Sequence, residues 1–233
     1  MPNWTSNDVV ITCKDEEQAK AIQKFVASED NPFDFDLIIP MPASLDIEAS
    51  GATDQDMLAY CKANNLQCPE NFSRDFWKDY KPNLERGKTA YENIKKYGHM
   101  TWYDWRRCNW GTKWNSDDAV VDVEGNCVRA QFSTAWACPT PILERLSALF
   151  PEAEIVVDSD YEGGYSSWRS IFQNGKCSFE GEYAMHIIDD DEETVYSSWE
   201  EVPDDHFAQE RRDEASTPWW NSEHGGDRWH GVP

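Results

Sequence analysis

The chain has 233 residues, and its 21 Lys and Arg against 44 Asp and Glu give a net charge of −23. A surface this acidic repels DNA, RNA and anionic membranes at long range, which excludes general nucleic-acid binding. Leu, Ile, Val and Phe together make up 41 residues, a low fraction that is typical of disordered chains. The 12 Trp and 9 Tyr oppose that interpretation, because each aromatic ring buries a large apolar area. We therefore expect a packed core.

The N-terminus and the cysteines point to a reducing compartment. Residues 1–8 lack the basic and apolar regions of a signal peptide, and the apolar runs are too short to span a bilayer. The seven cysteines are odd in number and form no CxxC pair. We therefore expect free thiols in the cytoplasm, with zinc binding as the alternative.

The first 42 residues predict a strand, a helix and an extended segment. Residues 8–14 contain a β-branched run that is typical of a strand. Residues 14–28 place Ala19, Ile22, Phe25 and Val26 on one helical face. Residues 33–42 alternate apolar and polar side chains, which predicts a short extended segment.

The rest of the chain up to residue 185 predicts a helical insertion inside an α+β fold. Residues 43–116 have mostly helical periodicity, with helices expected at 53–64 and within 72–96. The elements expected after the insertion are a hairpin of 119–123 and 127–134, a helix at 139–150, a strand at 154–158 and a hairpin of 163–172 and 177–185. Without the insertion this order is βαββαβ, a ferredoxin-like α+β sandwich with an extra hairpin.

Residues 186–233 predict an acidic C-terminal tail outside this domain of residues 1–185. Between residues 186 and 223 the chain has 13 acidic and 2 basic side chains. One interpretation is a solvated terminus, and the other is a docking segment that folds on a basic partner. The candidate partner-binding residues are Asp189, Asp190, Asp191, Glu192, Glu193, Glu200, Glu201, Asp204, Asp205, Trp219 and Trp220.

A cluster of rings and cations lies in residues 102–114. Interleaved aromatic and basic side chains are suited to base stacking with phosphate contact. The alternative is structural: the Trp rings fill the core, and the arginines stack on them. The candidate ligand-binding residues are Trp102, Trp105, Arg106, Arg107, Asn109, Trp110, Lys113 and Trp114.

A second cluster covers residues 132–141, where Thr140 or a neighbour is expected to cap the helix. Catalytic motifs are missing: the sequence has no GxSxG, no glycine-rich phosphate loop and no HExxH. Cys108, beside Arg107, is a weak candidate for a thiolate. We therefore expect a protein that is not an enzyme and has no metal or cofactor.

Five short motifs stand out along the chain: MPNW at residues 1–4, IIPMP at 38–42, WYxWR at 102–106, NWGTKW at 109–114 and TAW at 134–136 with Pro139 and Pro141. Together they resemble those of the family of YubB-type proteins with a ferredoxin-like domain, and the similarity spans about residues 1–185. The resemblance implies an accessory protein of a phage or plasmid, made in a bacterial cell, with no established activity and no catalytic residues to transfer. Family members usually carry proline where Cys138 stands.

Three functions are compatible with these observations. The first is an acidic inhibitor that occupies the nucleic-acid channel of a basic host protein or nucleoprotein complex, as a DNA mimic. The second is a protein that sequesters a nucleotide or small ligand through residues 102–114. The third is an enzyme with an unrecognised site. We favour the first, because the charge of the tail is placed for a basic partner.

Overall fold

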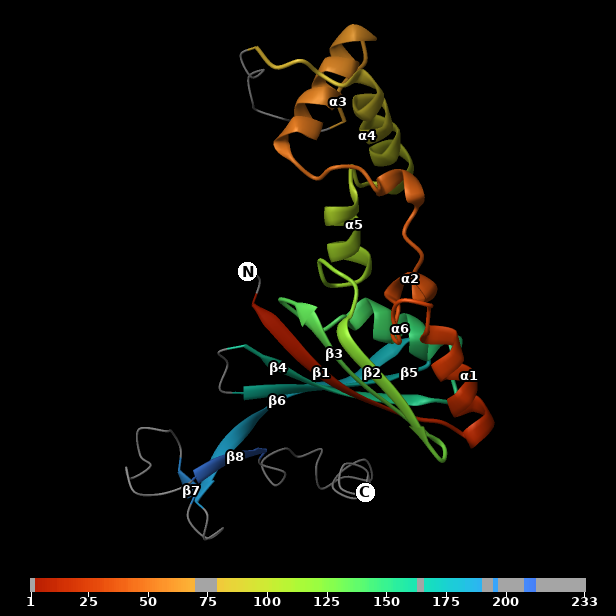
Figure 1. Ribbon diagram of the computed structural model, residues 1–233, viewed down its shortest axis with the longest axis vertical. Helices are drawn as coiled ribbons and strands as arrows, with labels where there is room; N and C mark the ends of the chain where they lie inside the picture. The colour runs from red at the N-terminus through yellow and green to blue at the C-terminus, as the bar shows by residue number, and fades with distance from the viewer. Residues whose placement is uncertain (1–2, 70–78, 163–165, 190–194, 197–207, 213–233) are drawn as a thin grey trace.

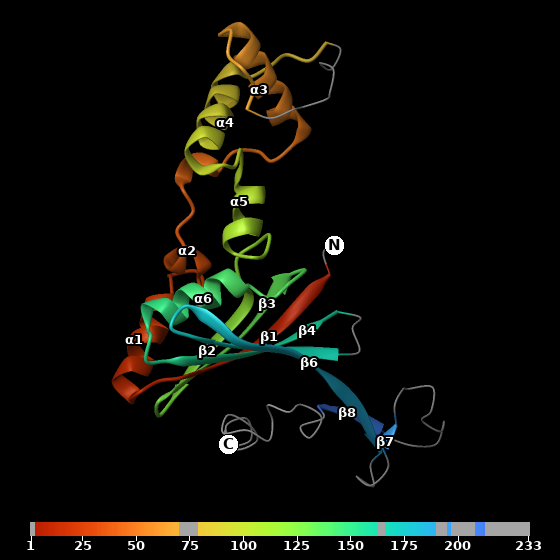
Figure 2. The same cartoon turned by 180° about the vertical axis from the view of Figure 1, so that it is seen from behind.

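The computed structural model of the protein describes residues 3–69, 79–162, 166–189, 195–196 and 208–212. Within these ranges, an antiparallel sheet carries helices on one face (Figure 1). An arm of three further helices projects away from the sheet, as the reverse view also shows (Figure 2). The molecule thus has a two-layer body and a helical arm.

The sheet has the strand order β2-β3-β1-β4-β5-β6, and all neighbouring strands are antiparallel. β1 therefore lies between strands that are far away in sequence: Val9 pairs with both Ala130 and Val157. The strands are β1 (Trp4–Thr12), β2 (Asp117–Glu124), β3 (Cys127–Ala135), β4 (Glu154–Tyr161), β5 (Ser166–Gln173) and β6 (Lys176–Asp189). Each lies where the sequence predicts a strand.

Two helices cover one face of this sheet. α1 (Glu16–Val26) begins at Asp15, whose carboxylate accepts a hydrogen bond from the backbone N–H of Gln18 at 2.8 Å. It packs over β2 and β3, whereas α6 (Thr140–Leu149) packs over β4 and β5. The predicted face of α1 is confirmed, since Ala19, Ile22 and Val26 are fully buried and Phe25 packs against the core as a half-buried residue.

The predicted extended segment at residues 33–42 is wrong. The segment instead contains a short helix, α2 (Phe35–Ile38). A 3-10 turn, η1 (Ala43–Leu45), follows it. Phe35 and Ile38 are three positions apart, so one helical turn buries both, and Asp34 caps it through the N–H of Asp36. The alternating pattern is too short to separate these two conformations.

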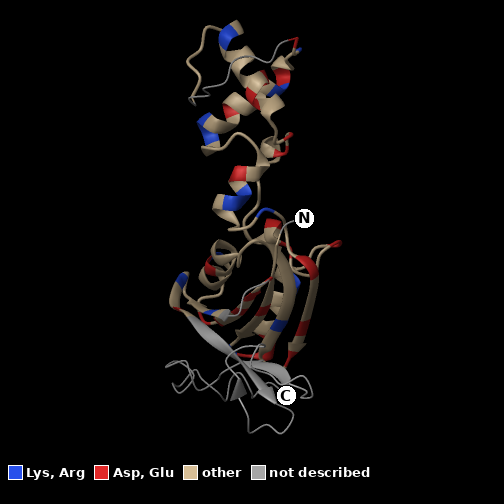
Figure 3. Ribbon diagram, turned by 90° about the vertical axis from the view of Figure 1, so that its left-hand side faces the viewer, with Lys and Arg blue, Asp and Glu red and all other residues tan. Residues whose placement is uncertain are grey.

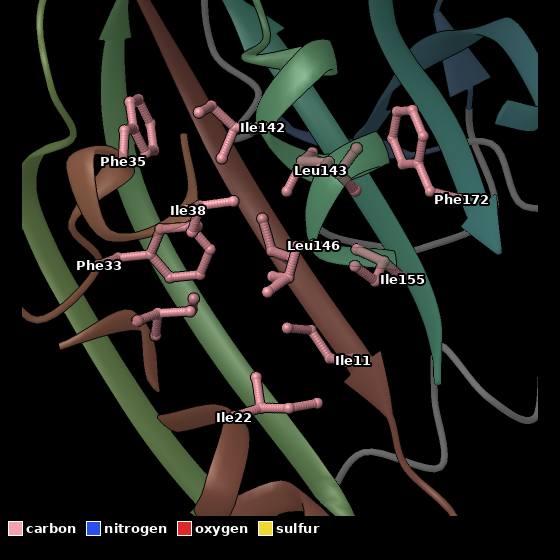
Figure 4. Close-up of a cluster of buried hydrophobic side chains, with 14 of the residues drawn as sticks. Ile11, Ile22, Phe33, Phe35, Ile38, Ile142, Leu143, Leu146, Ile155 and Phe172 are labelled. Carbon is pink, nitrogen blue, oxygen red and sulfur yellow. The ribbon is translucent and has the colours of Figure 1, made fainter. Parts of the chain in front are cut away.

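Aromatic rings supply much of the core between the helices and the sheet (Figure 4). The Phe33 and Phe132 rings stack with centroids 4.9 Å apart, and Phe35 meets Phe132 edge-on at 5.7 Å. Aliphatic side chains such as Ile11 and Leu146 complete this layer (Figure 4). The rings thus offset the shortage of aliphatic residues.

The arm consists of α3 (Gly51–Ala63), α4 (Leu84–Tyr97) and α5 (Trp102–Asn109). The expected helical insertion is therefore present, although α4 begins at Leu84 and residues 70–78 lie outside the described residues. α3 and α4 share a small separate core around Met57, Cys61 and Ala90. The arm thus has internal packing that does not depend on the sheet.

A buried carboxylate joins α3 to the start of α4. Asp56 is fully buried and accepts hydrogen bonds from Tyr80 Oη at 2.8 Å, the backbone N–H of Asn83 at 2.8 Å and Arg86 Nε at 2.5 Å. Gly87 lies so close to the Asp56 carbonyl that an added Cβ would be 2.2 Å from its oxygen. The two helices can approach this closely because residue 87 has no side chain.

β6 continues beyond residue 185, where the sequence predicts the end of the domain. Its last residues pair with β7 (Val195–Tyr196) and with β8 (Ala208–Arg212). The division into residues 1–185 and 186–233 stays a prediction.

Candidate functional site

The cluster at residues 102–114 is divided between the core and the surface. Trp105 and Trp110 belong to the main core, with 7% and 1% of their surface exposed. The indole N–H of Trp110 donates to the carbonyl of Ile39 at 2.9 Å. A ligand cannot stack on these two rings, so the structural interpretation holds for them.

Arg106 lies between two indole rings. Its guanidinium carbon is 4.6 Å from the centroid of Trp110 and 5.3 Å from that of Trp102. Burial lowers the pKa of this guanidinium, while Asp46 and Asp36 favour its charged form. Within the described residues its Nε atom has no hydrogen-bond partner. Arg106 therefore mainly packs α5 against its surroundings.

The outer side of the cluster forms a surface that we call the ring-and-cation patch, made of Tyr103, Arg107, Lys113, Trp114 and Trp136. The ammonium of Lys113 lies 4.5, 5.6 and 5.7 Å from the centroids of Trp114, Trp136 and Tyr103. The Arg107 guanidinium lies 5.4 Å from the Tyr103 centroid. Rings and cations therefore alternate across this surface.

Close backbone packing holds the patch together. Gly111 has φ +79°, and an added Cβ there would be 2.8 Å from Pro141 Cδ. The next residue, Thr112, is buried and donates its hydroxyl to the carbonyl of Ala135 at 2.8 Å. These contacts fix Lys113 and Trp114 beside the end of β3, next to Trp136.

Sequence reasoning missed Trp136 as a member of this site, because it assigned that residue to the separate cluster of residues 132–141. The NWGTKW and TAW motifs are each visible in the sequence, yet no local signal shows that they meet. Asn109, a predicted ligand residue, instead donates its amide to the carbonyl of Trp105 at 2.8 Å. It therefore has a structural role at the end of α5.

The expected side-chain cap of α6 is also wrong. The N-cap is Pro139, and it makes no side-chain hydrogen bond to the helix. A different threonine bonds the backbone just before the helix: the hydroxyl of Thr134 donates to the carbonyl of Ala137 at 2.7 Å. A proline at this position already restricts the backbone, which reduces the need for a polar cap.

The predicted partner-binding residues fall almost entirely outside the described residues. Asp189 is the last residue of β6, where its backbone pairs with Ala208. The others, Asp190, Asp191, Glu192, Glu193, Glu200, Glu201, Asp204, Asp205, Trp219 and Trp220, lie outside the described residues.

A different acidic surface lies within the described residues. We call it the acidic sheet face: Asp8, Asp118, Asp122 and Glu124, on the side of β1 and β2 opposite to the covering helices. Hollows of about 440 and 290 Å³ follow this face. Arg129 Nη2 is 3.1 Å from Glu124 Oε2, and the side-chain amide of Gln131 donates a hydrogen bond to Asp8 Oδ1 at 2.6 Å. Asp118 and Asp122 are exposed at the edge.

All seven cysteines are free thiols. Burial, with Cys127 and Asp15 acting in the same direction, raises the pKa of Cys13 from 9.0 to about 11. Burial also raises the pKa values of Cys61 and Cys138 to about 11. These three thiols are therefore protonated, and poor nucleophiles, at neutral pH.

The described residues contain neither a metal-binding cluster nor a membrane-spanning helix. Among the described residues, no group of three or more His, Cys, Asp or Glu side chains could hold a metal ion. Within the same ranges, no helix combines the length and the apolar content needed to cross a membrane.

Comparison with known proteins supports a ferredoxin-like domain. Residues 109–215 match the family described as "Ferredoxin-like domain in Api92-like protein". A crystal structure of a protein api92 from Yersinia pseudotuberculosis is similar over 79% of this chain and 99% of that chain, at 13% identity and TM-score 0.46. No curated protein matches the chain. The YubB-type label stays a prediction, whereas a mixed fold of helices and antiparallel sheet with a ferredoxin-like domain is confirmed.

Proposed function

We propose that this protein is a non-catalytic, acidic inhibitor made by a phage or plasmid in the cytoplasm of a bacterial host. It binds a basic host defence or nucleic-acid-processing complex and covers the surface that nucleic acid would use. The observation that carries the proposal is the row of exposed carboxylates on the acidic sheet face, in a chain whose net charge is −23. Such a field attracts and orients a basic partner.

In this proposal the acidic sheet face belongs to a ferredoxin-like unit. We take β1-α1-β2-β3-α6-β4 as one ferredoxin-like βαββαβ unit, with residues 43–116 as an insertion and β5–β6 as the extra hairpin. In this unit β2 is an edge strand, and its outward residues are available to a partner.

The spacing of the charges indicates how much the sheet face can contribute. Alternate residues on one strand face are about 7 Å apart, whereas one DNA strand carries a charge about every 3.4 Å. The carboxylates of this row on β2 are at residues 118, 122 and 124, with Val120 at the position between the first two. The row therefore has about a third of the charge density of a DNA strand. Strong mimicry requires the second acidic region, residues 186–223, with its 13 acidic and 2 basic side chains.

We would test the proposal with three variants. The sheet-face variant carries Asp118→Asn, Asp122→Asn and Glu124→Gln. The tail variant neutralises residues 189–193, 204 and 205. The control variant carries Glu17→Gln, Glu29→Gln and Glu92→Gln, which removes the same charge as the sheet-face variant at exposed positions on other elements.

Each protein is immobilised, incubated with bacterial lysate at 50 and 300 mM NaCl, and the bound proteins are quantified by mass spectrometry. We expect the parent and the control to retain one basic complex at low salt and release it at high salt. The sheet-face and tail variants should retain at least tenfold less of it, and DNA should compete with the parent for the purified complex. Equal retention by all four proteins, or binding unaffected by DNA, would refute the mimic.

Acidic edge strands also prevent sheet-to-sheet association, so the same variants need a solubility control. Gel filtration of each variant serves this purpose. Only variants that elute as the parent does are compared for binding.

A further inference from the structure

The ammonium of Lys113, a half-buried residue, lies in an unusual environment for a cation. Rings from α5, from the loop after α5 and from the end of β3 surround it at 4.5 to 5.7 Å. Within the part of the chain that the structure describes, Lys113 forms no salt bridge with a carboxylate. The rings fix its position, while its charge stays available to an anion.

Trp136 presents its ring beside Lys113 at a conformational cost. Its φ is +74°, in the left-handed region that bulky residues rarely adopt. Its backbone N–H donates to the carbonyl of Asn3 at 3.0 Å, and 38% of the residue is exposed. A glycine would fit this backbone without strain. Strained residues of this kind concentrate at functional sites.

The patch therefore combines one exposed ring, that of Trp136, and two half-buried rings, those of Tyr103 and Trp114, with fixed positive charge. The Trp136 and Trp114 rings flank Lys113, and Arg107 lies over Tyr103, 3.9 Å from Asp104. A carbohydrate or a proline-rich peptide also stacks on exposed rings, but neither supplies negative charge for two cations. A planar ring that carries phosphate uses both features.

We propose that the ring-and-cation patch binds a nucleotide, with the base against the indole of Trp136 and the phosphate accepting hydrogen bonds from Lys113 and Arg107. A free nucleotide and the end of a single strand share this chemistry. The net charge of −23 repels a long polyanion, whereas a single phosphate close to Lys113 experiences mainly the local cations. The free nucleotide is therefore the favoured source.

This site differs from the one that the sequence predicts. Trp105 and Trp110 are buried and do not contact the ligand. In the proposed site the rings of Tyr103 and Trp136 lie beside Lys113 instead. The site is also separate from the acidic sheet face, so it can exist whether or not the protein inhibits a basic complex.

The test measures binding of AMP, ATP and a ten-nucleotide single strand to the full chain by titration calorimetry. We compare the parent with Lys113→Met and Trp136→Gly, and with Lys20→Met as a matched control. Lys20 is an exposed lysine on α1 that is paired with Glu16. The thermal midpoint of each variant is measured in parallel.

We expect the parent and Lys20→Met to bind AMP and ATP equally well, and Lys113→Met and Trp136→Gly to bind them at least tenfold more weakly. Because glycine relieves the strained backbone, Trp136→Gly should melt no lower than the parent, which separates lost binding from lost folding. Absence of heat with both nucleotides, or full affinity in Lys113→Met and Trp136→Gly, would overturn the site. A strand that binds tenfold more tightly than ATP would overturn the free nucleotide as its ligand.

Discussion

At the scale of single residues, tryptophan has two opposite roles in this protein. Trp110 is a core residue whose indole N–H is used within the fold, whereas Trp136 is exposed on a strained backbone. Trp110 occurs in the NWGTKW motif and Trp136 in the TAW motif. The difference arises from their neighbours: Trp110 meets Phe35, and Trp136 meets the ammonium of Lys113.

The buried thiol of Cys13 makes a pH-dependent contribution to stability. Its pKa is about 11 in the folded protein and 9.0 without burial. Below pH 9 the thiol is protonated in both states, so its contribution is constant. Between pH 9 and 11 only the unfolded chain releases the proton, so stability falls as pH rises. Urea unfolding across this window should show a steeper loss in the parent than in Cys13→Ala. An equal loss of stability with pH in the two proteins would contradict this role of Cys13.

At the scale of elements, the arm depends on the contact between α3 and α4. Their shared core is small, with three buried apolar residues at its centre. The Asp56–Arg86 pair therefore has a large share in holding the helices together. Arg86 also pairs with Glu48, whose side chain is 56% exposed. The two carboxylates offer a comparison between a buried and an exposed partner of one arginine.

Asp56→Asn should destabilise the arm by about 3–5 kcal/mol, because it leaves Arg86 without its buried counter-ion. Glu48→Gln should cost less than about 1 kcal/mol, since an exposed pair contributes little. Amide hydrogen exchange would measure the effects of both substitutions. We expect faster exchange in α3 and α4 of Asp56→Asn and unchanged exchange in β1 and β4. Equal acceleration in the sheet would show that the arm does not unfold separately.

At the scale of the whole molecule, the charge is unevenly distributed. Residues 61–115 have 11 basic and 6 acidic side chains, whereas the chain as a whole has a net charge of −23. Basic and acidic segments are mixed along the arm (Figure 3). The ring-and-cation patch lies where the arm joins the sheet.

Repulsion among the excess carboxylates should make stability depend on salt. Raising NaCl from 0.01 to 0.1 M shortens the screening length from about 30 to about 10 Å, which weakens the repulsion. Exposed pairs such as Lys14–Glu152 also weaken, but each contributes little. We therefore expect the thermal midpoint to rise with salt, and to rise less in the sheet-face variant. A midpoint that is constant or falls would show that the repulsion is negligible.

The sequence by itself determined the local elements. A β-branched run predicts β1. The spacing of Ala19, Ile22, Phe25 and Val26 predicts α1, because burial on one side of a helix imposes a period on neighbouring residues. Where a segment is short, as at Phe35–Ile38, the same signal is ambiguous and the prediction is wrong. The acidic tail is visible in composition alone, although most of it lies outside the described residues.

Only the tertiary structure decided which residues meet. Asn7 donates to Thr134 at 2.9 Å and accepts from Ser159 at 2.9 Å, contacts that join three strands across more than 120 positions. In the same way, Lys113 meets Trp136, and the charged residues of β1 and β2 come to share one face. Such contacts depend on strand order and register, which arise from the packing of the whole core and have no signal within one segment of sequence.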